Sequence, residues 1–198
     1  MRFTIPNLIS VLRMGLVPLF IIAVLEGQSL RALLLFLAAG LTDALDGFIA
    51  RFANQQSLLG AYLDPIADKI LLTSAYIALT IPSLNHGVQI PVWITVLVIA
   101  RDLLMVAVAL ILYLAVGVRK FPPSILSKIN TAAQVAAVLV VLLSALLPDL
   151  ESIATTLLYL VAVLTVSSGL HYVIRYSRSS GQPASGNITP GESSGEQD

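Results

Sequence analysis

The sequence predicts an all-α integral membrane protein with six transmembrane helices, and its composition is the first reason. Of the 198 residues, 57% are hydrophobic and 11% are charged, and the mean hydropathy is +0.91. Soluble domains usually carry about 25% charged residues, so too little polar surface remains to cover a globule in water. The 11 basic and 11 acidic residues cancel, which leaves no bulk field that would favour nucleic acid. Disulfides and thiolate metal sites are excluded because the chain has no cysteine.

The second reason is that six apolar stretches approach the roughly 20 residues that a helix needs to cross a bilayer. We expect these helices near 8–25, 31–53, 58–81, 91–117, 127–147 and 152–175. The first begins with Pro6 in its opening turn, where the missing N–H is harmless. Turn-forming residues then separate each helix from the next. In chain order they are EGQ at 26–28, NQQ at 54–56, the segment 82–91, PP at 122–123 and PD at 148–149.

The third reason is that basic residues gather in alternate connections, as expected for a multi-pass protein of the cell membrane. One set of connections and ends holds Arg2, Arg51, Arg119, Lys120, Lys128, Arg175 and Arg178. We therefore expect both termini at the cytoplasmic side, together with the hairpin between the second and third helices; Arg31 alone breaks the pattern. Residues 1–176 form the predicted membrane domain. Residues 177–198 are rich in Ser, Gly and Pro and are predicted to be a disordered cytoplasmic tail.

Four aspartates stand in apolar sequence on either side of the turn at 54–56: Asp43, Asp46, Asp64 and Asp68. The first two are three residues apart and the last two are four apart, so each pair shares one face of its helix. Asp46 and Asp64 lie about seven residues from the turn on either side, or roughly 10 Å. An antiparallel hairpin would therefore bring the two carboxylate pairs face to face. Buried carboxylates are costly unless positive charge meets them.

Metal ions are the simplest source of that charge. Lys69 follows Asp68 directly on the helix, so its side chain should point elsewhere. All-oxygen ligands suit hard divalent ions, and we predict two Mg²⁺ or Mn²⁺ ions of the kind that assist phosphoryl displacement. Arg51 is placed to hold a phosphate in bidentate fashion. Small residues beside the carboxylates leave room for a ligand or for close helix packing: Gly47, Ala50 and Gly60.

The motif from Asp43 to Asp68 resembles the signature of the CDP-alcohol phosphatidyltransferase family. The matching pattern is Asp43-x-x-Asp46-Gly47-x-x-Ala50-Arg51 followed by Gly60-x-x-x-Asp64-x-x-x-Asp68. The resemblance implies a six-helix membrane fold, a homodimer, and a site that opens to the cytoplasmic leaflet. It also implies that the four aspartates hold two divalent metals on the pyrophosphate of a CDP-linked lipid. Asp68 would also be the general base for the acceptor hydroxyl, CMP would leave, and Gly47, Ala50, Gly60 and Arg51 would surround the nucleotide.

Within that family, "IPNLISVLRMGLVP" and "LDPIADKIL" resemble the branch of phosphatidylglycerophosphate synthases and cardiolipin synthases. Asp102 in "ARDLL" and Asn130 in "SKINTAAQ" favour the CMP-forming cardiolipin synthases, in which phosphatidylglycerol accepts the phosphatidyl group of CDP-diacylglycerol. The alternative acceptor is glycerol 3-phosphate, whose dianionic phosphate favours two cations rather than one lysine and a neutral amide. We name Lys128, Asn130 and Arg101 as candidate acceptor-binding residues; Arg13 is a further cation that could compensate.

Arg101 and Asp102 lie well inside the fourth predicted helix. Neighbours in sequence do not face each other on a helix, so we expect each to have its own partner. They form either an internal ion-pair network with other helices or part of the wall of the lipid or acceptor pocket.

Two other functions compete with a phosphatidyltransferase. In a membrane transporter the carboxylates would bind a cation on a translocation path, but the chain is short and shows no inverted repeat. An intramembrane prenyltransferase also uses aspartates and Mg²⁺ on a pyrophosphate, although those enzymes resemble longer bundles with differently spaced aspartates.

Overall fold

The computed structural model describes the backbone of residues 5–53, 58–82, 87–116 and 125–179, and the side-chain surroundings of residues 11–42, 67–82, 87–108 and 125–170. Within these ranges the chain is helical and contains no strand. The helices are α1 (Ile5–Leu25), α2 (Ser29–Ala53), α3 (Leu58–Thr80), α4 (Val92–Val116), α5 (Ile125–Ser144) and α6 (Glu151–Ser179). The predicted all-helical class is confirmed, and each helix begins and ends within a few residues of its predicted stretch.

Two details at the helix ends differ from the prediction. A short 3₁₀ helix, η1 (Pro148–Leu150), precedes α6, and Pro148 suits its first position because that position needs no N–H donor. Helix α6 continues to Ser179, past the expected domain end at 176. Residues 180–198 of the predicted tail lie outside the described part of the chain.

The EGQ turn between α1 and α2 has the geometry of a glycine-terminated helix. Gly27 has φ of 78°, a conformation that a residue without Cβ adopts at low cost. The N–H of Gln28 donates to the carbonyl of Ala23 at 2.9 Å, and that of Gly27 to the carbonyl of Val24 at 3.1 Å. These two bonds satisfy the last carbonyls of α1, as in a Schellman motif, and let α2 return antiparallel to α1.

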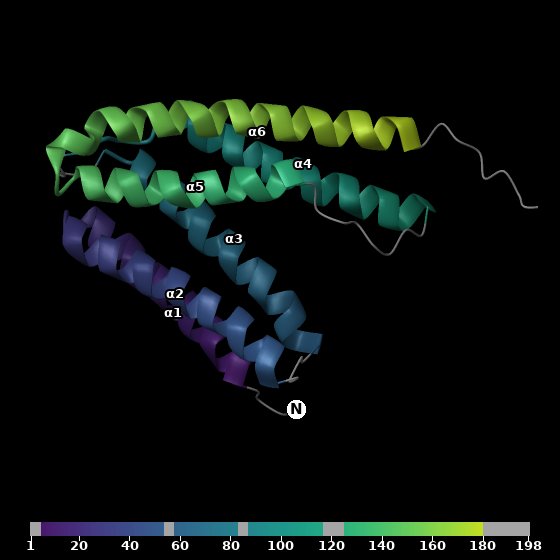
Figure 1. The fold of residues 1–198 in the computed structure, drawn as a ribbon, viewed down its shortest axis with the longest axis horizontal. Coiled ribbons are helices and arrows are strands. Elements are labelled where there is room, and N and C mark those ends of the chain that lie inside the picture. Colours follow the sequence, from purple (N-terminus) through teal and green to yellow (C-terminus); the bar gives the residue numbers. More distant parts are fainter. Residues whose placement is uncertain (1–4, 54–57, 83–86, 117–124, 180–198) are drawn as a thin grey trace, which may run out of the picture.

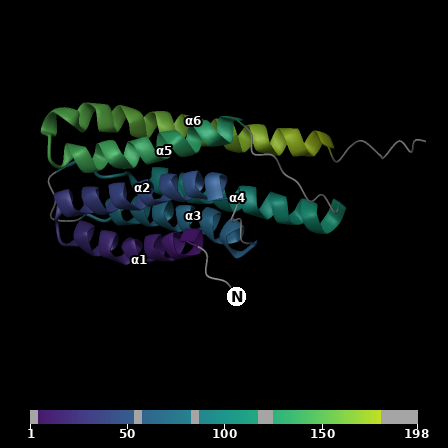
Figure 2. The ribbon, with the colours of Figure 1, turned by 60° about the horizontal axis from the view of Figure 1, so that its bottom comes forward.

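The helices form two groups of three, α1–α3 and α4–α6 (Figure 1). Helix α1 packs along both α2 and α3, and α6 packs along both α4 and α5, while α2 and α3 reach across to α5 and α4. We define the site end as the end where α1, α3 and α5 begin and α2, α4 and α6 end; Figure 2 shows this alternation from a second direction. In Figure 1 the axes of α1 and α2 diverge from those of α5 and α6 toward the site end.

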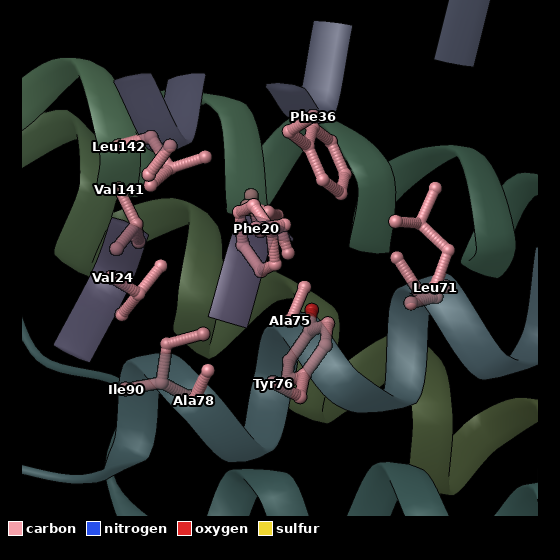
Figure 3. Close-up of a cluster of buried hydrophobic side chains, with 14 of the residues drawn as sticks. Phe20, Val24, Phe36, Leu71, Ala75, Tyr76, Ala78, Ile90, Val141 and Leu142 are labelled. Atoms are coloured by element: carbon pink, nitrogen blue, oxygen red, sulfur yellow. The ribbon is translucent and has the colours of Figure 1, made fainter. Parts of the chain in front are cut away.

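An apolar core joins the two groups, and its described residues lie in the middle of the helices and toward the end opposite the site end. Figure 3 shows Phe20, Phe36, Tyr76, Val141 and Leu142 gathered from four helices, with Ile90 from the segment before α4. The rings of Phe20 and Phe36 lie 5.8 Å apart between centroids. Close packing of these side chains supplies many small van der Waals contacts that together hold the two groups against each other.

The outward surface of the helices is apolar. Large side chains with at least half of their area exposed occur on α2, α4 and α6, including Leu34, Leu103, Val106, Val163 and Val166. Two segments, Ile125–Ser144 and Pro148–Leu170, are long and apolar enough to cross a membrane, and the shorter Val11–Leu25 and Ser29–Thr42 are also apolar. A surface of this kind fits contact with lipid rather than with water.

Candidate active site

The aspartate-bearing hairpin has the helix register that the sequence predicts. Helix α2 ends at Ala53 and α3 begins at Leu58, so Asp46 lies seven residues before one end and Asp64 six residues after the other. At 1.5 Å per residue, both stand roughly 10 Å from the turn. The side chains of seven predicted site residues lie outside the described set: Asp43, Asp46, Gly47, Ala50, Arg51, Gly60 and Asp64. Their backbone places them along the last turns of α2 and the first turns of α3.

Asp68 is the predicted catalytic residue whose side chain is described, and it forms an ion pair with Arg13 of α1. The guanidinium Nη1 of Arg13 donates to Oδ1 of Asp68. The Arg13 side chain is 0% exposed, whereas that of Asp68 is 48% exposed. A buried guanidinium therefore contacts a carboxylate whose side chain is about half exposed.

Sequence reasoning considered Arg13 only as a compensating cation and did not place it beside Asp68. The available signal was a single basic residue within the apolar α1, because charged residues inside membrane segments are generally functional. The partner is decided by packing: α1 lies along α3, which brings together two residues that are 55 positions apart.

A second set of polar contacts begins at the residue next to Asp68. Lys69 points away from Asp68 and donates to Oδ2 of Asp102 on α4 at 2.5 Å, as expected for neighbours on a helix. The other carboxylate oxygen of Asp102 accepts from Nη1 of Arg101 at 2.8 Å. Asp102 therefore has a partner on another helix, as expected, but it also pairs with its sequence neighbour, because the long Arg101 side chain can reach the adjacent carboxylate.

Arg101, which we predicted as a candidate acceptor-binding residue, is 5% exposed and is held by two further helices. Its Nε donates to the hydroxyl of Ser168 on α6 at 3.0 Å, and its Nη2 to the hydroxyl of Ser127 on α5 at 2.8 Å. With Lys69 and Asp102, these contacts link α3, α4, α5 and α6. The internal ion-pair network that we considered for Arg101 and Asp102 is therefore present.

The buried face between α5 and α6 changes from apolar to polar toward the site end. Asn130 and Gln134 on α5 and Thr165 on α6 are each 0% exposed. The Thr165 hydroxyl donates to Oδ1 of Asn130 at 3.1 Å. Nδ2 of Asn130 and both side-chain polar atoms of Gln134 have no hydrogen-bond partner among the described residues. Unsatisfied buried amides are costly, and Gln134 is a polar residue of this layer that sequence reasoning missed.

Lys128 and Asn130, which we predicted together as acceptor residues, have different surroundings. Lys128 is exposed and Asn130 is fully buried. Residues two apart on a helix point in nearly opposite directions, so the two side chains approach any shared ligand from different sides.

The donor chemistry of the hairpin fits divalent metal. All four predicted ligands are carboxylates, which suit Mg²⁺ and Mn²⁺. Arg13 neutralises part of the charge of Asp68, while about half of the Asp68 side chain stays accessible. Among the side chains that the structure describes, no three His, Asp or Glu groups form a metal cluster; Asp43, Asp46 and Asp64 are outside that set.

Comparison with known protein families gives a match over most of the chain. The model of the family described as CDP-alcohol phosphatidyltransferase matches residues 3–167. This range includes every residue of the aspartate motif.

Curated relatives fall into two named activities. The chain is 36% identical over 200 residues to a protein of Rattus norvegicus named cardiolipin synthase (CMP-forming), covering 93% of this chain and 65% of the relative. It is 35% identical to the Homo sapiens protein of the same name, covering 89% and 62%. A Haemophilus influenzae protein named CDP-diacylglycerol–glycerol-3-phosphate 3-phosphatidyltransferase is 32% identical, covering 87% and 93%. The chain thus spans less than two thirds of the two animal relatives and nearly all of the bacterial one.

Proposed function

Because the chain belongs to the CDP-alcohol phosphatidyltransferase family, we propose that it transfers the phosphatidyl group of CDP-diacylglycerol to a glycerol-type acceptor and releases CMP. The observation that carries this proposal is the complete aspartate motif on the α2–α3 hairpin, inside the matched range. We also propose that the protein crosses the cell membrane six times, works as a homodimer, and has its site end in the cytoplasm. The alternating basic connections support that orientation.

The proposed residue roles follow from the chemistry of the donor. Asp43, Asp46, Asp64 and Asp68 hold two Mg²⁺ or Mn²⁺ ions, which when bound neutralise the charge of the pyrophosphate. Gly47, Ala50 and Gly60 leave space for the nucleotide, and Arg51 donates to its phosphates. These assignments come from the motif and from the helix positions of its residues.

Asp68 is proposed as the general base. Its carboxylate removes the proton of the acceptor hydroxyl while that oxygen forms a bond to the phosphatidyl phosphorus and the bond from phosphorus to CMP breaks. Arg13 supports this role because its buried guanidinium holds one carboxylate oxygen of Asp68, while the side chain remains 48% exposed. A general base must be both oriented and accessible, and this pair supplies both conditions.

The acceptor is proposed to be phosphatidylglycerol, which would make the product cardiolipin. The names of the rat and human relatives support this choice, and that of the Haemophilus influenzae relative supports glycerol 3-phosphate as the alternative. Lys128, Asn130 and Arg101 are proposed to contribute to the acceptor pocket. For Asn130, the buried Nδ2 without a hydrogen-bond partner among the described residues supports that role.

The deciding experiment incubates the purified protein with CDP-diacylglycerol and Mg²⁺, with phosphatidylglycerol, glycerol 3-phosphate or no acceptor. Lipid mass spectrometry and CMP release are measured together, and Asp46→Asn is the inactive control. Cardiolipin with equimolar CMP supports the full proposal. Phosphatidylglycerophosphate alone would replace the acceptor but keep the reaction type. No CMP release with either acceptor would overturn the proposed function and would favour the alternative function of a cation transporter.

A further inference from the structure

We propose that Asp102 is a positioning residue that, through Lys69 and Arg101, holds the aspartate-bearing part of α3 in register with the α4–α6 group. This inference rests on the proposed function, because register matters only if donor and acceptor must meet between these groups. Neither Asp102 nor Lys69 belongs to the metal and nucleotide motif, and the two residues act through the placement of Asp68 and the acceptor pocket.

The contacts form one continuous network across four helices. Lys69 on α3 and Arg101 on α4 each donate to a different oxygen of Asp102, at 2.5 Å and 2.8 Å. Arg101 then donates to hydroxyls of Ser127 on α5 and Ser168 on α6, both within 3.0 Å. Among these described contacts, Asp102 is the carboxylate that joins Lys69 of α3 to Arg101, and Arg101 in turn contacts α5 and α6.

These contacts lie nearer the site end than the described part of the apolar core does. Among the described residues, the core side chains that join the two groups lie farther from the site end than Asp102 does on α4 or Lys69 on α3, and the axes of α1 and α2 diverge from those of α5 and α6 toward that end (Figure 1). Near Asp68, the described side-chain bond from α3 to α4 is the pair of Lys69 and Asp102. Ionic side chains are long enough to span helices that have begun to separate.

Asp68 and Lys69 bond α3 to a helix of each group. Asp68 pairs with Arg13 of α1, inside its own group, and Lys69 pairs with Asp102 of the other group. Through Asp102 and Arg101, the helix that carries the base is therefore bonded to Ser127, three residues before Asn130 on α5. A misplacement of about 1 Å between reacting groups can lower a rate by about 100-fold, so a loose α3 would reduce turnover without removing any catalytic group.

The cleanest perturbation is Lys69→Met, because the Lys69 side chain is 46% exposed and its removal leaves Arg101 paired with Asp102. The chain should therefore fold normally. We expect turnover to fall by about 10- to 100-fold, while the half-saturating Mg²⁺ concentration, set by the hairpin carboxylates, changes less than about threefold. Lys69→Arg keeps the cation and should recover most of the turnover. Asp102→Asn should reproduce the loss.

Thr95→Val is the matched control because it removes a second polar contact between the same two helices. The hydroxyls of Thr80 on α3 and Thr95 on α4 lie 2.5 Å apart, eleven residues along α3 from Lys69, or about 16 Å. This contact lies away from the site end, so its loss should leave turnover within about twofold of the wild type. The difference between the two variants separates positioning at the site from general packing of α3 on α4.

A distance measurement tests the inference independently of activity. The chain has no cysteine, so spin labels can be attached only at introduced positions, for example Leu41→Cys on α2 and Leu170→Cys on α6, both of which are exposed. We expect a narrow distance distribution in the wild type and with Thr95→Val, and a broader one with Lys69→Met. An unchanged distribution with Lys69→Met, or a broadened one with full turnover, would overturn the inference. If the wild type releases no CMP, the proposed function fails, and the label distances still decide whether Asp102 joins the groups.

Discussion

Replacing Arg13 by methionine tests whether the buried guanidinium serves Asp68 or only fills space in α1. The change keeps an unbranched apolar stem but removes the guanidinium that donates to Oδ1 of Asp68. Since Arg13 is 0% exposed, methionine occupies an interior position that suits it. Asp68, in contrast, loses the cation that orients it.

The change should cost less stability than the loss of a fully buried ion pair does, and it should also lower turnover. Breaking a buried ion pair costs about 3–5 kcal/mol when it leaves an unpaired charge inside, but Asp68 is 48% exposed and can be rehydrated. We therefore expect about 1–2 kcal/mol, or a fall in Tm of roughly 2–8 °C for a chain of this size. A hydrogen bond to a charged group contributes about 1.5–3 kcal/mol. If the transition state loses about 1.5 kcal/mol because the general base is no longer oriented, turnover falls about tenfold.

The assay measures CMP release per mole of folded protein, with Tm recorded on the same samples. Phe20→Leu is the control, because Phe20 is also fully buried on α1 but lies in the apolar core. It should lower Tm by a similar amount, since shortening a buried side chain costs about 1–2 kcal/mol, and should leave turnover nearly unchanged. Turnover of Arg13→Met within twofold of the wild type would refute a catalytic role for the pair, as would equal losses in both variants.

Three further outcomes are expected. Changing Asp43, Asp46 or Asp64 to asparagine should abolish CMP release while the protein still inserts into the membrane, because the side-chain shape is kept and the metal-binding charge is lost. Near-normal turnover of a variant would exclude that residue from the metal site. EDTA should stop the reaction and Mg²⁺ or Mn²⁺ restore it, whereas full activity in metal-free protein would contradict metal dependence. A reporter fused after Ser177 should report the cytoplasm and a tag inserted near His86 the outside; the reverse labelling pattern would invert the proposed topology.

Lys128→Ala provides a test of the acceptor side. Lys128 is exposed at the start of α5, so its loss should not affect folding. We expect weaker use of either acceptor, seen as a rise in the acceptor KM of a few-fold, because even a phosphodiester gains from one nearby cation. An unchanged KM for both acceptors would exclude Lys128 from the pocket. Asn130 is less suited to such a test, since a charge introduced at a fully buried position also destabilises the fold.

Helix positions and the aspartate pairs were predictable from sequence because each depends on local pattern. In a bilayer every backbone polar group must be satisfied within its own segment, so an apolar stretch of about 20 residues between turn residues has one stable conformation. Helical periodicity then places Asp43 with Asp46, and Asp64 with Asp68, on shared faces. The same reasoning correctly directed Lys69 away from Asp68.

Only the tertiary structure decided which side chains meet between helices. Arg13 reaches Asp68, Lys69 reaches Asp102, and Arg101 reaches Ser127 and Ser168 because of how far each helix is rotated about its axis and which helices are adjacent. In apolar surroundings no charge pattern along α4 or α6 specifies that rotation. It is set by the close packing of many apolar side chains at once, in which each contact contributes little and the sum is large. For the same reason, the sequence did not distinguish the buried Asn130 from the exposed Lys128 two residues before it.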